Sequence, residues 1–446
     1  MKIIVAGAGA VGSHLAKMLS QENHDIVLID PDEEKLRQVG GSLDVMTRAG
    51  SATSIADLMD CGVRKADLFI SVARNEETNI TASILSKRLG AKKTIARIDN
   101  QEYLYVRHRE HFISMGIDYM IYPEKIASKE IVGLLHQTGS TDIVDFSGGK
   151  LSMFVVKIDE DSAITGKSLN EIDKQEEKNE FRAVAISRDG ETIIPDGDFV
   201  IHPGDFIYVI ATQEGIETLM ELSGKKKYDV RNIMILGGSR IGMLTAKDLG
   251  TQHNIKLIEK EREKSYKLSN MLNNTLVING DGRDVNMLAE EGLENMDAFI
   301  AVTGDSETNI LSCLLARRLG VKKTICEVEI LDYISLAENM GIDTIINKKI
   351  IAASRIFRFT SAESVSAVKC LTGTDAEVME FEVKPDSKIT QASLNQLSFP
   401  KNSLIGGVIR GEMSFIANGY TLIKPGDKVV VFTLPSAIPK VNKFFN

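Results

Sequence analysis

The 446-residue sequence has few cysteines, no excess of basic residues and no long apolar run. Its cysteines, Cys61, Cys313, Cys326 and Cys370, show no CxxC spacing, which argues against a disulfide framework and a zinc site. Lysine and arginine number 53 against 62 acids, a net charge of −9, which argues against a nucleic-acid partner. No apolar run approaches the roughly 18–20 residues that span a bilayer, and glycine appears too early for a signal peptide. We therefore expect a soluble cytoplasmic protein.

The chain contains an internal repeat. Residues 72–97 and 302–327 are identical at 13 of 26 positions, including ETNI and RLGxKKTI, with an offset of 230. A second pair of segments, 181–210 and 403–432, shares alternating apolar residues and a Pro-Gly-Asp turn. The sequence therefore predicts a tandem A–B–A′–B′ array, with residues 225–229 (KKKYD) as the polar linker between the halves.

A glycine-rich turn follows the first predicted strand. Residues 2–6 (KIIVA) are typical of a strand covered on both faces. GAGAVG at 7–12 leads into a helix predicted over about 11–22, and the next strand, 24–30, ends on Asp30. Strand, glycine turn, helix, strand and acid make up the βαβ dinucleotide fingerprint. The alternative is a glycine turn retained only for packing.

Each residue of this fingerprint has a physical role. Gly7 permits the tight turn, Gly9 lets a pyrophosphate approach the backbone, and Gly12 lets the helix pack against the strand. The helix N-terminus offers its N–H groups to phosphates. Asp30 can accept hydrogen bonds from ribose hydroxyls and would repel a 2′-phosphate, which favours NAD(H) over NADP(H).

The first block continues as alternating strands and helices. Further strands are predicted at about 44–48, 66–73, 92–98 and 116–123, with a helix at 77–90 ending on Gly90. Six strands with intervening helices predict a doubly wound sheet. The loop Gly50-Ser51-Ala52-Thr53 should approach the adenosine, and Ser51 or Thr53 could cap the helix after it. Glu77, Thr78 and Asn79, which recur at 307–309, either cap a helix or line the crevice.

The second copy departs from the fingerprint. Its turn is Gly237-Gly238-Ser239-Arg240-Ile241-Gly242, in which the Ser239 side chain would crowd a pyrophosphate. The acid is kept as Glu259. Two basic residues are lost, since Glu327 stands in the place of Arg97 and Gly304 in the place of Arg74. Both a weaker or differently selective nucleotide site and a degenerate copy kept for assembly fit this pattern.

A dehydrogenase needs an acid/base group near the nicotinamide. No such group recurs in both copies of this sequence. The β-rich segments after each nucleotide block contain turns such as 195–197 and 203–205, but no shared histidine. His108 and His111 form HxxH, which is not the HExxH metal motif and suits a solvated helix face. We therefore expect no catalytic residue and no metal site.

Together these motifs resemble the TrkA family of bacterial potassium-uptake regulators. The resemblance rests on GAGAVG with Asp30, the loop at 50–53, the ETNI block, IARI at 95–98 and the two Pro-Gly-Asp turns, and it covers essentially the whole chain. It implies an α/β fold, with a doubly wound Rossmann-like parallel sheet followed by a small β-rich α+β domain, the pair repeated in tandem. The implied domains are N-terminal RCK domains at 1–123 and 230–348 and C-terminal TrkA-C domains at 138–223 and 364–446.

The resemblance also implies that NAD(H), or alternatively ATP or ADP, is bound as a signal and not converted. The candidate binding residues of the first half are Gly7, Ala8, Gly9, Ala10, Val11, Gly12, Asp30, Ser51, Ala52, Thr53, Ala73, Arg74 and Arg97. Those of the second half are Gly237, Gly238, Ser239, Arg240, Ile241, Glu259, Thr303 and Gly304.

The expected partners follow from the same resemblance. They are a membrane potassium-transport subunit of the TrkH/TrkG type and further copies of the chain, in a dimer or a ring of tandem units on the inner face of the membrane. Residues 123–137 and 348–363 occupy the place of the family's crossover helix, which packs against a neighbouring unit. The alternative is that their apolar residues belong to the ordinary core. An NAD-dependent oxidoreductase and an assembly module with a vestigial nucleotide site are the alternative interpretations.

Overall fold

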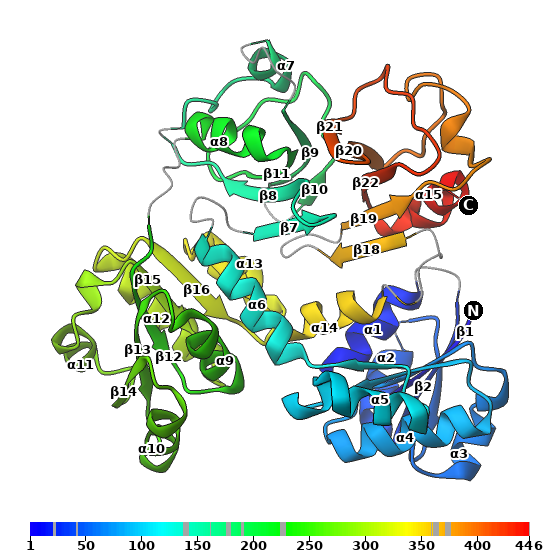
Figure 1. The fold of residues 1–446 in the computed structure, drawn as a ribbon, viewed down its shortest axis with the longest axis horizontal. Coiled ribbons are helices and arrows are strands. Elements are labelled where there is room, and N and C mark those ends of the chain that lie inside the picture. The colour runs from blue at the N-terminus through cyan, green and yellow to red at the C-terminus, as the bar shows by residue number, and fades with distance from the viewer. Residues whose placement is uncertain are drawn as a thin grey trace. The chain divides into compact units, whose positions relative to one another are not determined.

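The computed structural model describes residues 1–20, 24–41, 43–136, 142–160, 162–174, 180–188, 191–223, 229–357, 359, 365–370 and 376–445. The chain divides into two compact units. Figure 1 labels their helices and strands. The first comprises Met1–Ile126 with Lys349–Val368, and the second comprises Ala127–Lys348 with Lys369–Asn446. Within the described ranges, no helix is long and apolar enough to cross a membrane.

The first unit is built on a six-stranded parallel sheet with the order β3-β2-β1-β4-β5-β6. Its strands are β1 (Lys2–Ala6), β2 (Asp25–Asp30), β3 (Met46–Ala49), β4 (Leu68–Ser71), β5 (Lys93–Arg97) and β6 (Tyr119–Ile121). β1 pairs in parallel with β2 on one side and with β4 on the other. The strand order therefore reverses at β1, and ligands of such sheets bind at the carboxyl ends of the strands beside this switch point.

Helices connect these strands. They are α1 (Ala10–Ser20), α2 (Glu33–Gly40), α3 (Ile55–Asp60), η1 (Val63–Lys65), α4 (Glu76–Leu89), η2 (Gln101–Leu104), α5 (Val106–Met115) and α6 (Pro123–His136). Gly90 ends α4 with a φ of 122°, as predicted. The prediction that Ser51 or Thr53 caps the next helix was wrong. α3 begins only at Ile55, and the Ser54 side chain accepts the N–H of Asp57 at 3.3 Å.

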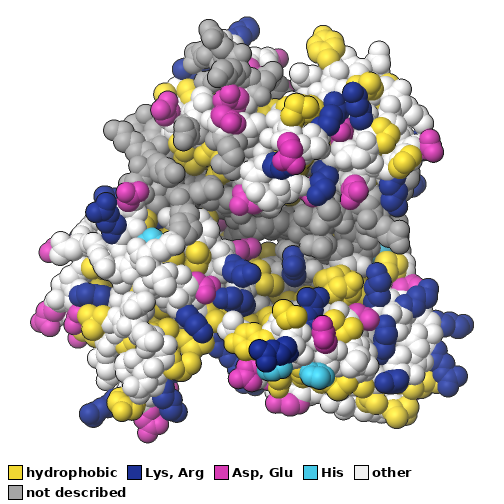
Figure 2. All heavy atoms as spheres, viewed as in Figure 1, with side chains coloured by type: hydrophobic (Ala, Val, Ile, Leu, Met, Phe, Trp, Pro, Cys, Tyr) yellow, Lys and Arg dark blue, Asp and Glu magenta, His cyan; other side chains and the backbone are white. Residues whose placement is uncertain are grey.

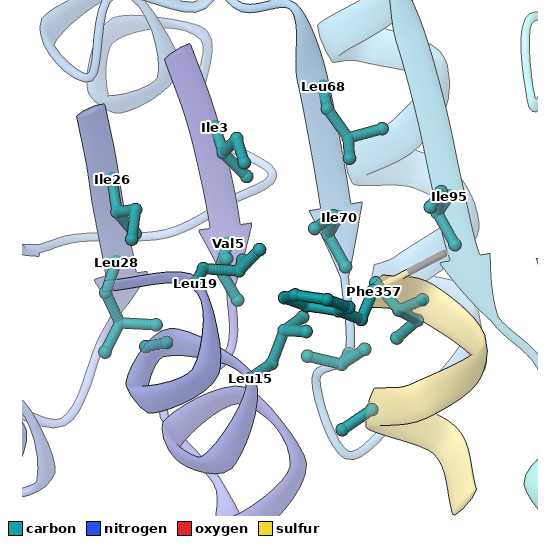
Figure 3. Close-up of a cluster of buried hydrophobic side chains, with 14 of the residues drawn as sticks. Ile3, Val5, Leu15, Leu19, Ile26, Leu28, Leu68, Ile70, Ile95 and Phe357 are labelled. Atoms are coloured by element: carbon teal, nitrogen blue, oxygen red, sulfur yellow. The ribbon is translucent and has the colours of Figure 1, made fainter. Parts of the chain in front are cut away.

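A helix from far along the chain completes the core of the first unit. α14 (Lys348–Phe357) contributes Ala353, Ile356 and Phe357 to the apolar cluster beneath the sheet. Figure 3 shows the Phe357 ring among side chains of α1 and of strands β1 and β4. Two residues further along the chain, the ring centroids of Phe359 and Tyr119 lie 4.1 Å apart.

Conversely, residues 127–136 of α6 belong to the second unit. Each predicted crossover helix therefore starts in one unit and continues in the other. Gln137, Arg358 and residues 360–363 of these segments lie outside the described residues.

The second unit contains a matching parallel sheet with the order β14-β13-β12-β15-β16-β17. Its strands are β12 (Asn232–Leu236), β13 (Asn254–Glu259), β14 (Thr275–Asn279), β15 (Ala298–Ala301), β16 (Lys323–Glu327) and β17 (Thr344–Ile346). Its helices are α9 (Arg240–Leu249), α10 (Arg262–Met271), α11 (Val285–Glu290), η3 (Leu293–Asn295), α12 (Ser306–Arg318) and α13 (Asp332–Asn339). The same strand order in both halves confirms the tandem repeat of a doubly wound sheet.

Each parallel sheet is followed by a five-stranded sheet whose strands pair antiparallel. The first has the order β10-β9-β11-β8-β7, with β7 (Asp142–Phe146), β8 (Leu151–Lys157), β9 (Phe181–Arg188), β10 (Glu191–Ile193), β11 (Phe206–Ala211), α7 (Leu169–Asp173) and α8 (Gln213–Leu222). The second has the order β18-β19-β22-β20-β21, with β18 (Val365–Cys370), β19 (Glu377–Glu382), β20 (Ser403–Arg410), β21 (Met413–Ile416), β22 (Lys428–Thr433), η4 (Lys388–Thr390), η5 (Pro435–Ala437) and α15 (Ile438–Phe445). These sheets confirm the predicted β-rich α+β domains. Residues 189–190 and most of the predicted linker lie outside the described residues.

The aspartate of each Pro-Gly-Asp turn is buried in an ion pair. Asp205 accepts two hydrogen bonds from the Arg188 guanidinium, both 2.7 Å long, and is 1% exposed. In the second half, Asp427 and Arg410 form the same two-pronged pair at 2.8 and 2.7 Å. The repeated turn therefore ties the start of one strand to the end of its neighbour, which is a structural role.

On the face drawn in Figure 2, basic and acidic side chains are interspersed with apolar ones.

Replacing Asp205 with asparagine should lower the free energy of unfolding by about 2 kcal/mol, because the Arg188 guanidinium then loses its charged partner. Urea unfolding measures this change. Asp196→Asn is the matched control, since Asp196 is exposed and its bond to the N–H of Asp198 can be kept by asparagine. Equal midpoints for the two variants would contradict the structural role of the pair.

Replacing Phe357 with alanine should destabilise the first unit by about 3–5 kcal/mol, because it leaves a cavity in a closed core. Hydrogen exchange followed by mass spectrometry should then show faster exchange in β1 and β4. Tyr266→Ala, at a side chain 71% exposed, is the control and should change little. Unchanged exchange in β1 would show that α14 does not support this sheet.

Candidate nucleotide-binding sites

The glycine turn of the first half lies at the carboxyl end of β1, between β1 and α1. Gly7 has a φ of 107°, and a Cβ there would lie 2.8 Å from the backbone nitrogen of Ala73. A Cβ at Gly12 would collide with the carbonyl oxygen of Gly7. A Cβ at Gly9, in contrast, would have nothing within 4 Å. The turn is therefore closed by Gly7 and Gly12 and open at Gly9, where the fingerprint places a pyrophosphate.

Asp30 binds this turn directly. One carboxylate oxygen accepts the N–H of Ala8 at 2.6 Å, and the other accepts the N–H of Asp32 at 2.9 Å. The side chain is 9% exposed at the end of β2. Because each oxygen can accept a second hydrogen bond, Asp30 can still bind ribose hydroxyls while it holds the turn in place.

Two basic side chains, Lys35 of α2 and Arg74 of the loop after β4, belong to the segments that follow β2 and β4. Lys35 forms an ion pair with Asp32 at 3.0 Å, and this bond raises the pKa of Lys35 while Arg74 acts to lower it. Arg74 is exposed in the loop after β4. Its side chain is therefore accessible to a ligand in solution.

Arg97 lies less favourably for that purpose. Its Nη2 is 3.3 Å from a carboxylate oxygen of Asp99 and 3.8 Å from one of Glu124. Ser51 and Thr53 share a hydrogen bond between their hydroxyl groups at 2.9 Å, and the N–H of Ser51 binds Asp57. The loop at 50–53 is therefore held by a hydrogen bond within the loop and by another to α3.

Asn79 holds the loops around the site together, a role that the sequence did not predict. Its amide donates to the carbonyl oxygens of Ala73 and Arg97, both at 3.0 Å, and its oxygen accepts the Ser71 hydroxyl. The side chain is 1% exposed, so it neither caps α4 nor lines the crevice. Asn309 makes the same two carbonyl bonds, to Thr303 and Glu327. The recurrence of ETNI in both halves was the sequence signal from which this role could have been found.

The second half contains a pocket of about 340 Å³ at the equivalent place. Among the predicted residues, it is lined by Gly237, Ser239, Glu259, Thr303 and Gly304. Ser239 caps α9, since its hydroxyl accepts the N–H of Gly242 at 3.2 Å.

Glu259 repeats the contacts of Asp30 and adds an ion pair. It accepts the N–H groups of Gly238 at 3.0 Å and Glu261 at 2.9 Å, and Lys264 lies 2.8 Å away. Burial raises the pKa of Glu259, but the N–H of Glu261 and the Lys264 ammonium outweigh it and hold the pKa below its ordinary value of 4.5.

An ion-pair cluster lines this pocket where the first half has the loop at 50–53. Asp281 binds Arg283 at 2.6 Å and Lys260 at 3.1 Å. The Arg283 guanidinium beside Asp281 holds the pKa of that carboxyl well below its usual range. These residues were not predicted, although the repeat offset places Asp281 and Arg283 opposite Ser51 and Thr53.

The exchange of Arg97 for Glu327 reverses an ion pair at the start of the crossover helix. Arg97 faces Glu124 of α6 in the first half, whereas Glu327 faces Lys348 of α14 at 3.3 Å in the second. Glu327 is 2% exposed, so this charge pairs inside the fold. Among the described residues, no group of His, Cys, Asp and Glu could hold a metal ion.

Comparisons with known proteins agree with this architecture. The TrkA-N domain model matches residues 3–123 and 233–348, and the TrkA-C domain model matches residues 153–224 and 378–446. The chain belongs to the TrkA family. A Trk system potassium uptake protein TrkA homolog from Methanosarcina mazei is 33% identical over 456 residues, covering 100% of both chains. TrkA of Vibrio alginolyticus is 32% identical over 439 residues, covering 97% of this chain and 95% of its own.

Solved structures share the fold. The crystal structure of the GsuK RCK domain has a TM-score of 0.60 at 17% identity, covering 97% of this chain and 92% of its own. A GsuK channel bound to NAD also has a TM-score of 0.60, at 16% identity, covering 100% of this chain and 78% of its own. GsuK bound to ADP has a TM-score of 0.52 at 14% identity, covering 80% of this chain and 68% of its own. The RCK fold of this TrkA family member is thus established.

The pKa of Glu259 predicts a pH dependence. Since the folded-state pKa is lowered, the carboxylate should stabilise the fold fully above about pH 4.5 and lose this contribution as the pH falls. Glu259→Gln should therefore destabilise the chain more at about pH 7 than at about pH 3, as measured by urea unfolding at both values.

Glu261→Gln is the control, because the Glu261 side chain is exposed and makes no cap bond to α10. A Glu259→Gln effect that grows as the pH falls would mean that the carboxylate does not stabilise the turn.

Proposed function

We propose that the chain is the nucleotide-binding regulatory subunit of a Trk-type potassium uptake system. The single observation that carries the proposal is the open position at Gly9 beside the buried Asp30, which together form a binding place for a dinucleotide. The ligand proposed for it is NAD(H), because Asp30 suits free ribose hydroxyls, with ATP or ADP as the second candidate. That GsuK structures are bound to NAD and to ADP supports both ligand classes.

The proposed binding residues are those predicted from the sequence, with roles refined by the geometry. Ala8 and Gly9 form the part of the turn that faces the pyrophosphate. Asp30 accepts hydrogen bonds from the ribose hydroxyls, and Arg74 attracts the phosphates. Arg97 is engaged with Asp99 and Glu124, so we assign it the smallest part. The sites fall in the proposed domains 1–123 and 230–348.

The proposed partner is a membrane potassium-transport subunit of the TrkH/TrkG type, which the chain would meet on the cytoplasmic face as a homo-oligomer. Support comes from the relatives named as Trk system potassium uptake proteins. The two described above match this chain over 100% and 95% of their own lengths. A ligand shifts such an assembly only by its different affinity for two shapes.

We propose regulation without chemistry. The polar groups nearest the turn already hold the backbone, since Asp30 accepts two backbone N–H groups and the Asn79 amide donates to two carbonyls. The one further role proposed for Asp30 is to accept hydrogen bonds from the ribose. An NAD-dependent oxidoreductase would need an acid/base group aimed at the nicotinamide. NADH incubated with the pure protein should be recovered unchanged.

Gly9→Asp should abolish NADH binding to the first half, because it places a carboxylate where the pyrophosphate lies. Isothermal titration calorimetry on the full chain measures the loss. Gly9→Ala is the control for folding, since a Cβ there has nothing within 4 Å in the protein and should leave the fold intact. Its methyl group should weaken NADH binding less than the carboxylate of Gly9→Asp does.

NADH affinity that survives Gly9→Asp unchanged would remove this turn from the site. Absence of any nucleotide heat with the wild-type chain would leave the assembly module with a vestigial site as the better description.

A further inference from the structure

The pocket of the second half differs from the first at the end where phosphates would lie. We propose, building on the proposed function, that this pocket binds a nucleoside or a nucleoside monophosphate and rejects nucleotides that carry a pyrophosphate. Three observations support this: the cap of α9, the loop after β15 and the groups kept at the ribose end.

The helix end that would receive a pyrophosphate is already occupied. The Ser239 hydroxyl accepts the N–H of Gly242 at 3.2 Å and lines the pocket. In the first half the same position is Gly9, which has no side chain and open space beside it. A phosphate in the second half therefore meets a hydroxyl group in its place and one fewer backbone donor.

The loop after the fourth strand of the sheet changes its charge. In the first half it carries Arg74, whereas the second half has Gly304 followed by Asp305. Asp305 lines the pocket and caps α12 by accepting the N–H of Thr308 at 2.6 Å. This bond lowers the pKa of Asp305, so the side chain is ionised at neutral pH. Relative to the first half, this loop has lost one positive charge and gained one negative charge, so it favours a ligand with less phosphate charge. Lys260 and Lys264, which also line the pocket, are paired with Asp281 and Glu259.

The ribose end, in contrast, is complete. Glu259 sits at the end of β13 with the same backbone contacts as Asp30, so ribose hydroxyls still find an acceptor. Arg283 is fixed by its bonds to Asp281, and a planar guanidinium held this way can stack on a base. The volume of about 340 Å³ is at the lower end of the roughly 300–1,000 Å³ found for small-molecule sites.

Titration calorimetry on the full chain tests this, with the first site blocked by Gly9→Asp. In that background AMP should bind once per chain, and ADP and NADH should bind at least about tenfold more weakly than AMP. Adding Glu259→Ala should remove the AMP heat, which assigns it to the second pocket. Circular dichroism checks that each variant is folded.

A gain of binding provides the converse test. Ser239→Gly, Gly304→Arg and Asp305→Asn together give the second half the residues of the first. In the blocked background this triple variant should bind ADP about tenfold more tightly than its parent. Glycine is a tolerated helix cap, so α9 should be kept.

ADP or NADH binding as tightly as AMP in the blocked background, through Glu259, would overturn the inference. So would the absence of AMP heat there, or a triple variant without a gain. The proposed function fails by a different result, namely a wild-type chain whose NADH binding is not reduced by Gly9→Asp.

Discussion

In both halves, one carboxylate at the end of the second strand of the sheet holds the glycine turn at the end of the first. Asp30 binds the N–H of Ala8, and Glu259 binds the N–H of Gly238. This hydrogen bond joins two neighbouring parallel strands at the edge where ligands bind. It fixes the start of the following helix, and so decides which backbone donors a ligand meets. The remaining features of each site are arranged around it.

The loops beyond the turn are held by a second repeated contact, the buried amide of Asn79 or Asn309. Since this side chain bonds to one carbonyl just after the fourth strand of the sheet and to the last carbonyl of the fifth, it fixes the loop that faces the glycine turn. The two halves can therefore keep one framework while exchanging the residues at its surface. Gly9 and Ser239, or Arg74 and Gly304, are exchanges of this kind, and the strand order of the sheet is the same in both halves.

The sequence predicted the features that depend on local pattern. The glycine turn, Asp30, the six-strand alternation and the tandem repeat were all visible, because short apolar runs and glycines at fixed spacing report backbone geometry directly. The part played by α14 could not be predicted, since Phe357 is apolar in any core and nothing in its pattern names the sheet that it covers. The cap of α3 was misplaced by one to three residues, because Ser51, Thr53 and Ser54 are all good caps and only the turn geometry selects among them.

The central claim is that the first glycine turn holds an adenine dinucleotide that is not converted. A crystal structure of the full chain with NADH tests it most directly. The account predicts density across residues 7–12, with the ribose hydroxyls on the Asp30 carboxylate and the nicotinamide still reduced. An empty turn at saturating NADH, or an oxidised or cleaved ligand recovered from the crystals, would contradict it.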